Sequence, residues 1–265
     1  GYPPPLDLCP PLKDNHMRPE DETEIMTLLR RSYQNSSTFP VGDFGEKEWR
    51  EYRWAYFRMI ELVDKHIGKV LSALHESGQD KETIILFTSD HGDCQGAHQW
   101  NQKTVFYDES SRVPFIISYP GNNPGSVSEQ LVHTGVDIIP TLCNLAGIPV
   151  PDNLPGINLA PIALGKIKEI QREYIVTQTR FLQGGEFDGR IPKPSGRMLR
   201  SKRYKYCVYN MGNHRESLID MERDPGEMVN LARKDSHANI LKEHRNYLWE
   251  WCNKYGDDFP VPGFH

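Results

Sequence analysis

Apolar positions along the chain predict a long amphipathic helix that leads directly into a buried strand. From Glu46 to Ser77, apolar side chains recur every three or four residues and form one stripe along a helix, which Gly78 ends. The run Thr83–Ser89 is then continuously apolar and β-branched, without polar alternation. Such a run is typical of a strand that is buried on both faces in a parallel sheet. Together the two elements favour an α/β fold.

A polar segment separates this strand from a second apolar run, Val113–Tyr119, which predicts the next strand. The first strand stops at Asp90 and His91, and open α/β sheets place their chemistry just past the carboxyl ends of their strands. Hard divalent cations prefer carboxylate oxygens, so Asp90 is a candidate metal ligand, and the imidazole of His91 also suits zinc or manganese. The alternative for Asp90 is a turn-forming or helix-capping role, which aspartate often takes.

Two further helices are predicted on either side of this α/β step. The acidic residues at its start and the arginines near its end favour a helix over Pro19–Gln34, because this charge order suits the helix dipole. A second helix is expected to begin at Asp137, its candidate N-cap, and to close at Gly147.

The pattern changes beyond Gly165, where short strands replace the long elements. The predicted strands are Glu173–Thr179, Arg197–Arg200, Tyr204–Tyr209 and Ser217–Asp220. A helix capped by Ser236 follows them. Residues 1–165 are therefore expected to belong to an α/β core, and residues 166–265 to a small α+β subdomain with an antiparallel sheet and one helix.

Composition narrows the classes of protein that the chain can belong to. It has 265 residues, of which 37% are hydrophobic, which is enough for a packed core. Its net charge of −5 argues against a nucleic-acid partner, which needs a basic face, and no apolar run reaches the roughly 18 residues of a membrane span. The five cysteines are scattered and odd in number, which argues against a disulfide framework and a zinc knuckle.

Several motifs carry a resemblance to a known family. The run Thr88-Ser89-Asp90-His91-Gly92, followed by Lys103 and by Arg112-Val113-Pro114, resembles the second half of a formylglycine-dependent sulfatase, a family of the alkaline phosphatase superfamily. The run Asp220–Leu231 is similar to the turn of the sulfatase C-terminal subdomain. The resemblance extends over nearly the whole chain, and it implies part of an alkaline-phosphatase-like parallel-sheet sandwich followed by the small α+β subdomain.

The resemblance also implies roles for individual residues. It places Asp90 and His91 on a divalent cation, with calcium as the expected ion, and Lys103 on a sulfate oxygen. A lysine suits that role because its compact ammonium group offers three donors. His98 is a candidate to line the pocket for a sulfated glycan or small molecule, and the alternative for it is simple loop packing.

The formylglycine nucleophile is not expected within this chain. Cys9-Pro10-Pro11-Leu12-Lys13 nearly matches the C-x-P-x-R signal for formylglycine, but its last residue is lysine and a Pro-rich stretch surrounds it. We interpret Cys9 as an ordinary surface cysteine and expect the nucleophile in an N-terminal half of the same protein. The chain by itself is therefore expected to be inactive.

Three functions are compatible with these motifs. The first is a sulfuric ester hydrolase that removes sulfate from a carbohydrate or an aryl sulfate. The second is a metal-dependent phosphatase or phosphodiesterase of the same superfamily, with zinc or manganese, and the third is a non-catalytic scaffold. Lys103, the Arg112-Val113-Pro114 strand and the Asp220–Leu231 turn favour the first. A periplasmic, lysosomal or secreted location would fit the family.

Overall fold

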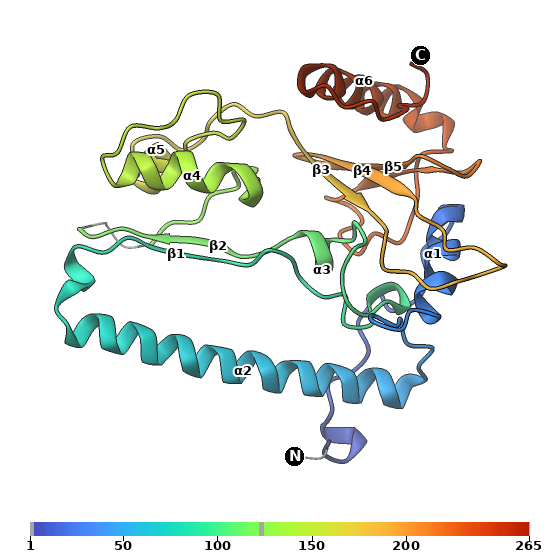
Figure 1. Cartoon of the computed structure of the whole chain (residues 1–265), viewed down its shortest axis with the longest axis horizontal. Coiled ribbons are helices and arrows are strands. Elements are labelled where there is room, and N and C mark those ends of the chain that lie inside the picture. The colour runs from blue at the N-terminus through green and yellow to red at the C-terminus, as the bar shows by residue number, and fades with distance from the viewer. Residues whose placement is uncertain (1–2, 122–124, 265) are drawn as a thin grey trace. The chain divides into compact units, whose positions relative to one another are not determined.

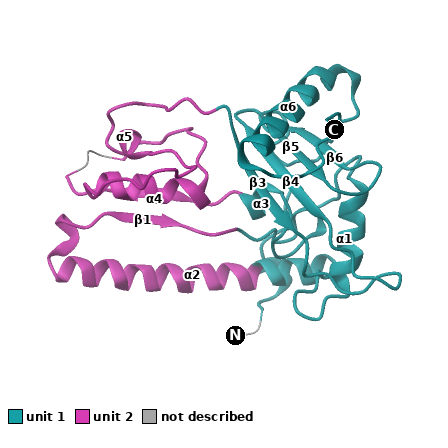
Figure 2. Cartoon of the chain, turned by 45° about the horizontal axis from the view of Figure 1, so that its top comes forward, with its two compact units in different colours: residues 1–53, 92–111, 173–265 teal, residues 54–91, 112–172 magenta. Residues whose placement is uncertain are grey.

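The structure of the chain is a computed structural model that describes residues 3–121 and 125–264 (Figure 1). The chain groups into two compact units, which Figure 2 distinguishes by colour. Unit 1 consists of residues 1–53, 92–111 and 173–265, and unit 2 consists of residues 54–91 and 112–172. The loop 92–111 thus belongs to unit 1, although the strands on both sides of it belong to unit 2. The predicted division at residue 165 stays a prediction.

Unit 2 contains most of α2 and a pair of short strands. Helix α2 spans Glu46–Glu76, as its apolar periodicity predicts. Strands β1 (Ile85–Thr88) and β2 (Phe115–Ser118) lie where the two apolar runs predict them. They pair antiparallel, which corrects the parallel arrangement that the first run favoured for this pair. The continuous apolar run indicates a tendency to be buried, and it carries no information on the direction of the neighbouring strand.

Unit 2 also contains α4, which spans Thr134–Leu145 and begins earlier than predicted. The N-cap is His133, and Asp137 lies inside the first turn, fully buried. Its carboxylate accepts the backbone N–H groups of His133 at 2.7 Å and Ile157 at 2.9 Å. It also pairs with the guanidinium of Arg172, at 2.5 and 2.9 Å. Asp137 therefore ties the start of α4 to two distant segments, a long-range role that the N-cap prediction missed.

Unit 1 is built on a four-stranded antiparallel sheet with the order β3-β4-β5-β6. The strands are β3 (Tyr174–Arg180), β4 (Ser195–Ser201), β5 (Tyr204–Tyr209) and β6 (Glu216–Asp220). This confirms the predicted antiparallel sheet and its hairpin between β4 and β5. Helix α6 (Ala238–Tyr255) follows, and Ser236, its predicted cap, lies instead in the short 3-10 helix Asp235–His237.

The sheet of unit 1 has an apolar core on each face, because successive side chains of a strand point to opposite sides. On one face, Leu199, Tyr206 and Leu218 pack against Leu248 of α6. On the other face, a second cluster joins the sheet to α1 (Glu24–Gln34) and to the loop 92–111. Figure 1 shows α6 and α1 on these opposite faces.

Short helical turns complete the chain. They are Leu6–Leu8, Gln79–Lys81, Ala97–Gln99, α3 (Asp108–Ser111) and α5 (Ala160–Ala163). Helix α1 starts five residues later than predicted, because Glu20 pairs with Val229 in an isolated bridge and Thr23 has an extended backbone. Within the described residues, no helix has the length and hydropathy that a membrane span requires.

Candidate functional site

Asp90 and His91 lie together just past the end of β1. The carboxylate oxygen Oδ2 of Asp90 is 3.4 Å from Nε2 of His91, and the two side chains are 84% and 39% exposed. A local turn fixes their backbone, because His91 N–H donates to Asp90 Oδ1 at 3.0 Å and Ser89 Oγ donates to the His91 carbonyl at 2.7 Å. The two side chains therefore present a carboxylate oxygen and an imidazole nitrogen side by side.

The donor set and spacing of this pair fit a divalent cation. Two ligands held at right angles at roughly 2.3 Å from one ion are about 3.2 Å apart, close to the spacing of Asp90 and His91. Oxygen from Asp90 suits calcium, whereas nitrogen from His91 is also common with zinc and manganese. A calcium ion takes about six or more oxygen ligands, so this pair supplies part of a coordination shell.

Lys103 lies in the loop 92–111, in a strained stretch of unit 1. Its neighbours Gln102 and Thr104 both have left-handed backbones, with φ values of 69° and 76°. Non-glycine residues in this conformation cost of order 1 kcal/mol or more and persist only where the surroundings hold them. Lys103 itself is half-buried. The backbone that carries the Lys103 ammonium group is therefore held in this conformation by the surrounding structure.

His98, the other predicted substrate-binding residue, has no exposed surface. Its ring stacks on Tyr107, with 3.7 Å between ring centroids. Burial disfavours the charged imidazolium and lowers the pKa of His98 to about 4, so the ring is neutral near pH 7. This environment favours the loop-packing alternative, and substrate binding by His98 stays a prediction.

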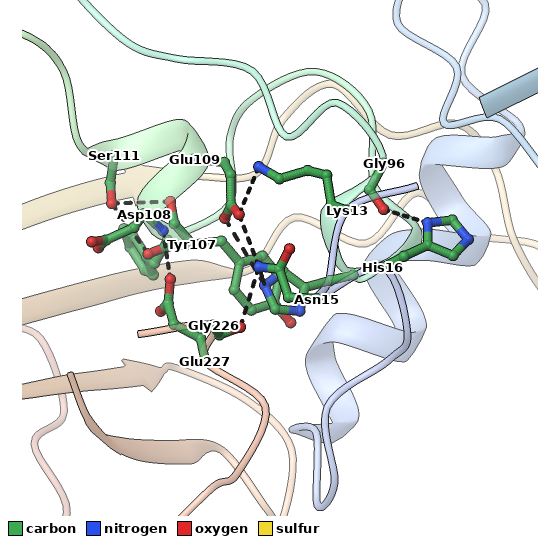
Figure 3. Close-up of polar contacts among 12 residues, drawn as sticks. Lys13, Asn15, His16, Gly96, Tyr107, Asp108, Glu109, Ser111, Gly226 and Glu227 are labelled. Carbon is green, nitrogen blue, oxygen red and sulfur yellow. Dashed lines mark hydrogen bonds and ion pairs between the residues drawn. The ribbon is translucent and has the colours of Figure 1, made fainter. Parts of the chain in front are cut away.

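A polar cluster, which sequence reasoning missed, lies beside His98, and Figure 3 shows its members Lys13, Asn15, Glu109 and Glu227. One ligand atom each of His98, Glu109 and Glu227 lies within 4.8 Å of the others, a spacing that a metal ion could bridge. Two ammonium groups already contact the acids, however: Lys13 Nζ is 2.9 Å from Glu109, and Lys205 Nζ is 2.7 Å from Glu227. Both glutamates therefore already have a cationic partner within the protein.

No sequence spacing could have revealed this cluster, because its members come from four separate segments. Asn15 joins them: its amide group donates to Glu109 Oε1 at 2.8 Å and to the Gly226 carbonyl at 3.2 Å. The one available signal was the Asp220–Leu231 turn, which contains Glu227 and which the sequence had already singled out as similar to sulfatases.

Cys9 does not have the surroundings that a formylglycine precursor would need. Its backbone is extended, with φ −77° and ψ 147°, and no helix starts there. The cysteine is only 4% exposed, which corrects its interpretation as a surface residue. The Arg50 side chain covers this stretch by donating to the carbonyls of Leu6, Cys9 and Pro10. Cys9 is thus a packed structural residue.

Comparisons with known proteins agree with the motifs and the fold. The family model for sulfatases matches residues 12–148, and that for the C-terminal part of N-sulphoglucosamine sulphohydrolase matches residues 96–254. The chain is 37% identical over 219 residues to a Delta 4,5-hexuronate-2-O-sulfatase of Bacteroides thetaiotaomicron, covering 82% of this chain and 44% of that protein. It is 35% identical over 204 residues to arylsulfatase K of Bos taurus, covering 77% and 37%.

A solved structure gives the same result for the fold. A 2-O GAG sulfatase superposes with a TM-score of 0.83 at 32% identity, over 98% of this chain and 54% of that one. The chain belongs to the sulfatase family, which confirms the predicted resemblance and fold class. It spans less than half the length of the two sulfatases to which its sequence was compared. Family membership supports a divalent metal as the cofactor.

Proposed function

We propose that the chain is the second half of a sulfuric ester hydrolase that acts on a sulfated carbohydrate. The observation that carries this proposal is the Asp90–His91 pair, a metal-compatible donor set at the end of a strand in a chain of the sulfatase family. The names of the relatives support the substrate class, since one is a hexuronate-2-O-sulfatase and another is a 2-O GAG sulfatase.

Each proposed site residue has a distinct task. Asp90 and His91 would hold a calcium ion, which would supply positive charge to polarise the sulfate ester. Lys103 binds a sulfate oxygen and neutralises its charge. His98, buried behind Tyr107, would act on substrate only through the loop that it supports. The formylglycine nucleophile and the remaining metal ligands come from an N-terminal half of the same protein, which is the proposed partner of this chain.

The proposal is tested by Asp90→Asn in the full-length protein, assayed with an aryl sulfate and calcium. The substitution keeps the size of the side chain but removes the charge that binds the cation, so kcat/KM should fall by about 10²-fold or more. Calcium removal by a chelator should abolish turnover of the wild type, and added calcium should restore it.

Asp93→Asn is the matched control. Asp93 lies three residues further on and accepts hydrogen bonds from the Tyr52 hydroxyl and from Gln95 N–H, contacts that an amide oxygen can also make. It should leave kcat/KM within about 3-fold. Hydrolysis of a phosphate monoester with zinc or manganese, in place of the sulfate, would support the phosphatase alternative. Turnover of neither ester would support a non-catalytic scaffold.

A further inference from the structure

Lys205 on β5 is a buried lysine whose ammonium group is fully satisfied. The side chain is 1% exposed, yet its three donors meet three acceptors. These are Glu227 Oε1 at 2.7 Å, the Phe106 carbonyl at 3.0 Å and Asp108 Oδ1 at 2.5 Å. Two of the three acceptors belong to the loop 92–111. Burying a charge is costly, so such a lysine requires every one of these contacts to be kept.

Glu227 also contacts the loop 92–111 directly, in addition to its contact with the Lys205 ammonium group. Its second oxygen, Oε2, accepts the backbone N–H of Asp108 at 2.6 Å. The residue is 3% exposed and has a left-handed backbone, with φ 58°. Burial acts to lower the pKa of Lys205, but the carboxylates of Glu227 and Asp108 outweigh it and raise that pKa. The lysine therefore stays charged. Lys205 and Glu227 together hold the main chain at residues 106–108 through hydrogen bonds to the Phe106 carbonyl and to the Asp108 N–H group.

The chain that precedes Lys103 is also held in place by hydrogen bonds. The Asn101 side chain accepts from Gly42 N–H at 2.8 Å and donates to the Pro40 carbonyl at 3.1 Å. Only four residues lie between Asn101 and Phe106, and Lys103 is one of them, flanked by its two left-handed neighbours. A strained backbone relaxes when one of its two anchors is released.

We propose that Lys205 and Glu227 are positioning residues, which hold the loop 92–111 so that the Lys103 ammonium group is presented to the sulfate. This inference rests on the proposed function of Lys103. Neither residue is required to touch the substrate. The pair links the turn of the C-terminal subdomain to the sulfate-binding loop, so that the affinity for the sulfate group depends on a contact within the small subdomain.

The test compares three variants of the full-length protein with an aryl sulfate as substrate. Lys103→Ala should have the largest effect of the three, a fall in kcat/KM of about 10²-fold. Glu227→Gln keeps an acceptor for Asp108 N–H but removes the charge that faces Lys205, and Lys205→Met removes all three bonds. Both should raise KM, and the inhibition constant of inorganic sulfate, by about 10-fold, with kcat changed less than about 3-fold, because a misplaced ammonium group weakens binding of the charged group.

Amide hydrogen exchange gives a readout that is independent of activity. Residues 99–106 should exchange faster in Glu227→Gln and Lys205→Met than in the wild type. The control is Glu216→Gln, which breaks a half-buried ion pair of unit 1, between Glu216 and Arg245, without a described contact to the loop. It should lower stability while KM and exchange of the loop stay at the wild-type values.

Each outcome separates the inference from the function on which it rests. If Glu227→Gln leaves KM and loop exchange unchanged, or if Glu216→Gln raises KM equally, the positioning role is overturned. If Lys205→Met does not fold, the results for Glu227→Gln alone test the positioning role. If Lys103→Ala has no effect, the sulfate-binding role of Lys103 fails, and the proposal that Lys205 and Glu227 present Lys103 to the sulfate fails with it. Faster loop exchange in Glu227→Gln would then show only that the pair holds the loop.

Discussion

The two units of the chain differ in how completely they bury their apolar residues. Both hydrophobic clusters belong to unit 1, where Leu29, Leu199 and Leu218 have no exposed surface. In unit 2, by contrast, many large apolar side chains are at least 38% exposed. On α2 and the two strands they are Met59, Ile60, Leu62, Val63, Val70, Leu71, Phe87 and Ile116. Unit 1 thus has two buried apolar clusters, although some of its large apolar side chains, such as Leu8 and Leu182, are exposed as well, whereas most of the apolar stripe of α2 in unit 2 is exposed.

The exposed residues of unit 2 form an organised surface. Phe87 and Ile116 are directly opposite each other across β1 and β2, and they are 41% and 57% exposed. We call the exposed apolar residues of α2, β1 and β2 the apolar face of unit 2, and exposed apolar groups of this kind often mark an interface. Because the chain spans 44% of a related sulfatase, we expect the N-terminal half of the protein to cover this face. The apolar periodicity of α2 and β1 predicted burial, whereas in the described chain most of α2 and Phe87 of β1 are exposed, so burial of these elements stays a prediction.

The largest expected effect concerns the buried ion pair between Asp137 and Arg172, which holds the start of α4 in unit 2. Asp137→Asn leaves Arg172, whose side chain is 11% exposed, without its charged partner. Breaking a buried pair by neutralising one partner costs about 3–5 kcal/mol. Chemical denaturation of the full-length protein, followed by circular dichroism, should show this loss. A change below about 1 kcal/mol would mean that unit 2 does not depend on this contact.

A pair of alanine substitutions tests the comparison itself. Leu218→Ala in the core of unit 1 should lower the free energy of unfolding by about 2–5 kcal/mol, because it leaves a cavity. Ile116→Ala should cost at least about 1 kcal/mol in the full-length protein if the face of unit 2 is covered there. A cost below about 0.5 kcal/mol, the usual value for an exposed site, would show that the face remains open to solvent.

Sequence patterns predicted those elements whose signals are local. The periodicity of α2, the hairpin of β4 and β5 and the short strand β6 all follow from neighbouring residues, and each was confirmed. The Asp90–His91 pair was recognised for the same reason, since two adjacent residues at a strand end form one motif.

Interactions between distant segments could not be predicted in this way. The contact of Lys205 with Phe106 spans 99 residues, and Asp137 reaches Arg172 across 35. Whether β1 pairs parallel or antiparallel also depends on a partner strand and not on its own residues. Burial of His98 is a further example, because histidine in a polar loop gives no sign of the ring of Tyr107 that covers it.

The smallest expected effect is a pH dependence of stability that originates in unit 1. His98 has a pKa of about 4 in the folded chain, mainly because burial disfavours its charge, against an ordinary value of 6.5. The unfolded chain therefore binds more protons between pH 6.5 and 4, and the folded state loses stability as the pH falls through this window. For this group alone the loss is about 2 kcal/mol at pH 5.

The measurement is the free energy of unfolding of the wild type and of His98→Gln at pH 7.5 and pH 5. Glutamine does not titrate, so the variant should lose less stability on acidification than the wild type, by about 2 kcal/mol. Gln99→Ala, at the adjacent position, is the control and should keep the wild-type pH dependence. Equal losses in the wild type and His98→Gln would mean that the His98 ring is protonated inside unit 1, with Glu109, whose carboxylate lies 4.0 Å from Nε2, as its counter-ion.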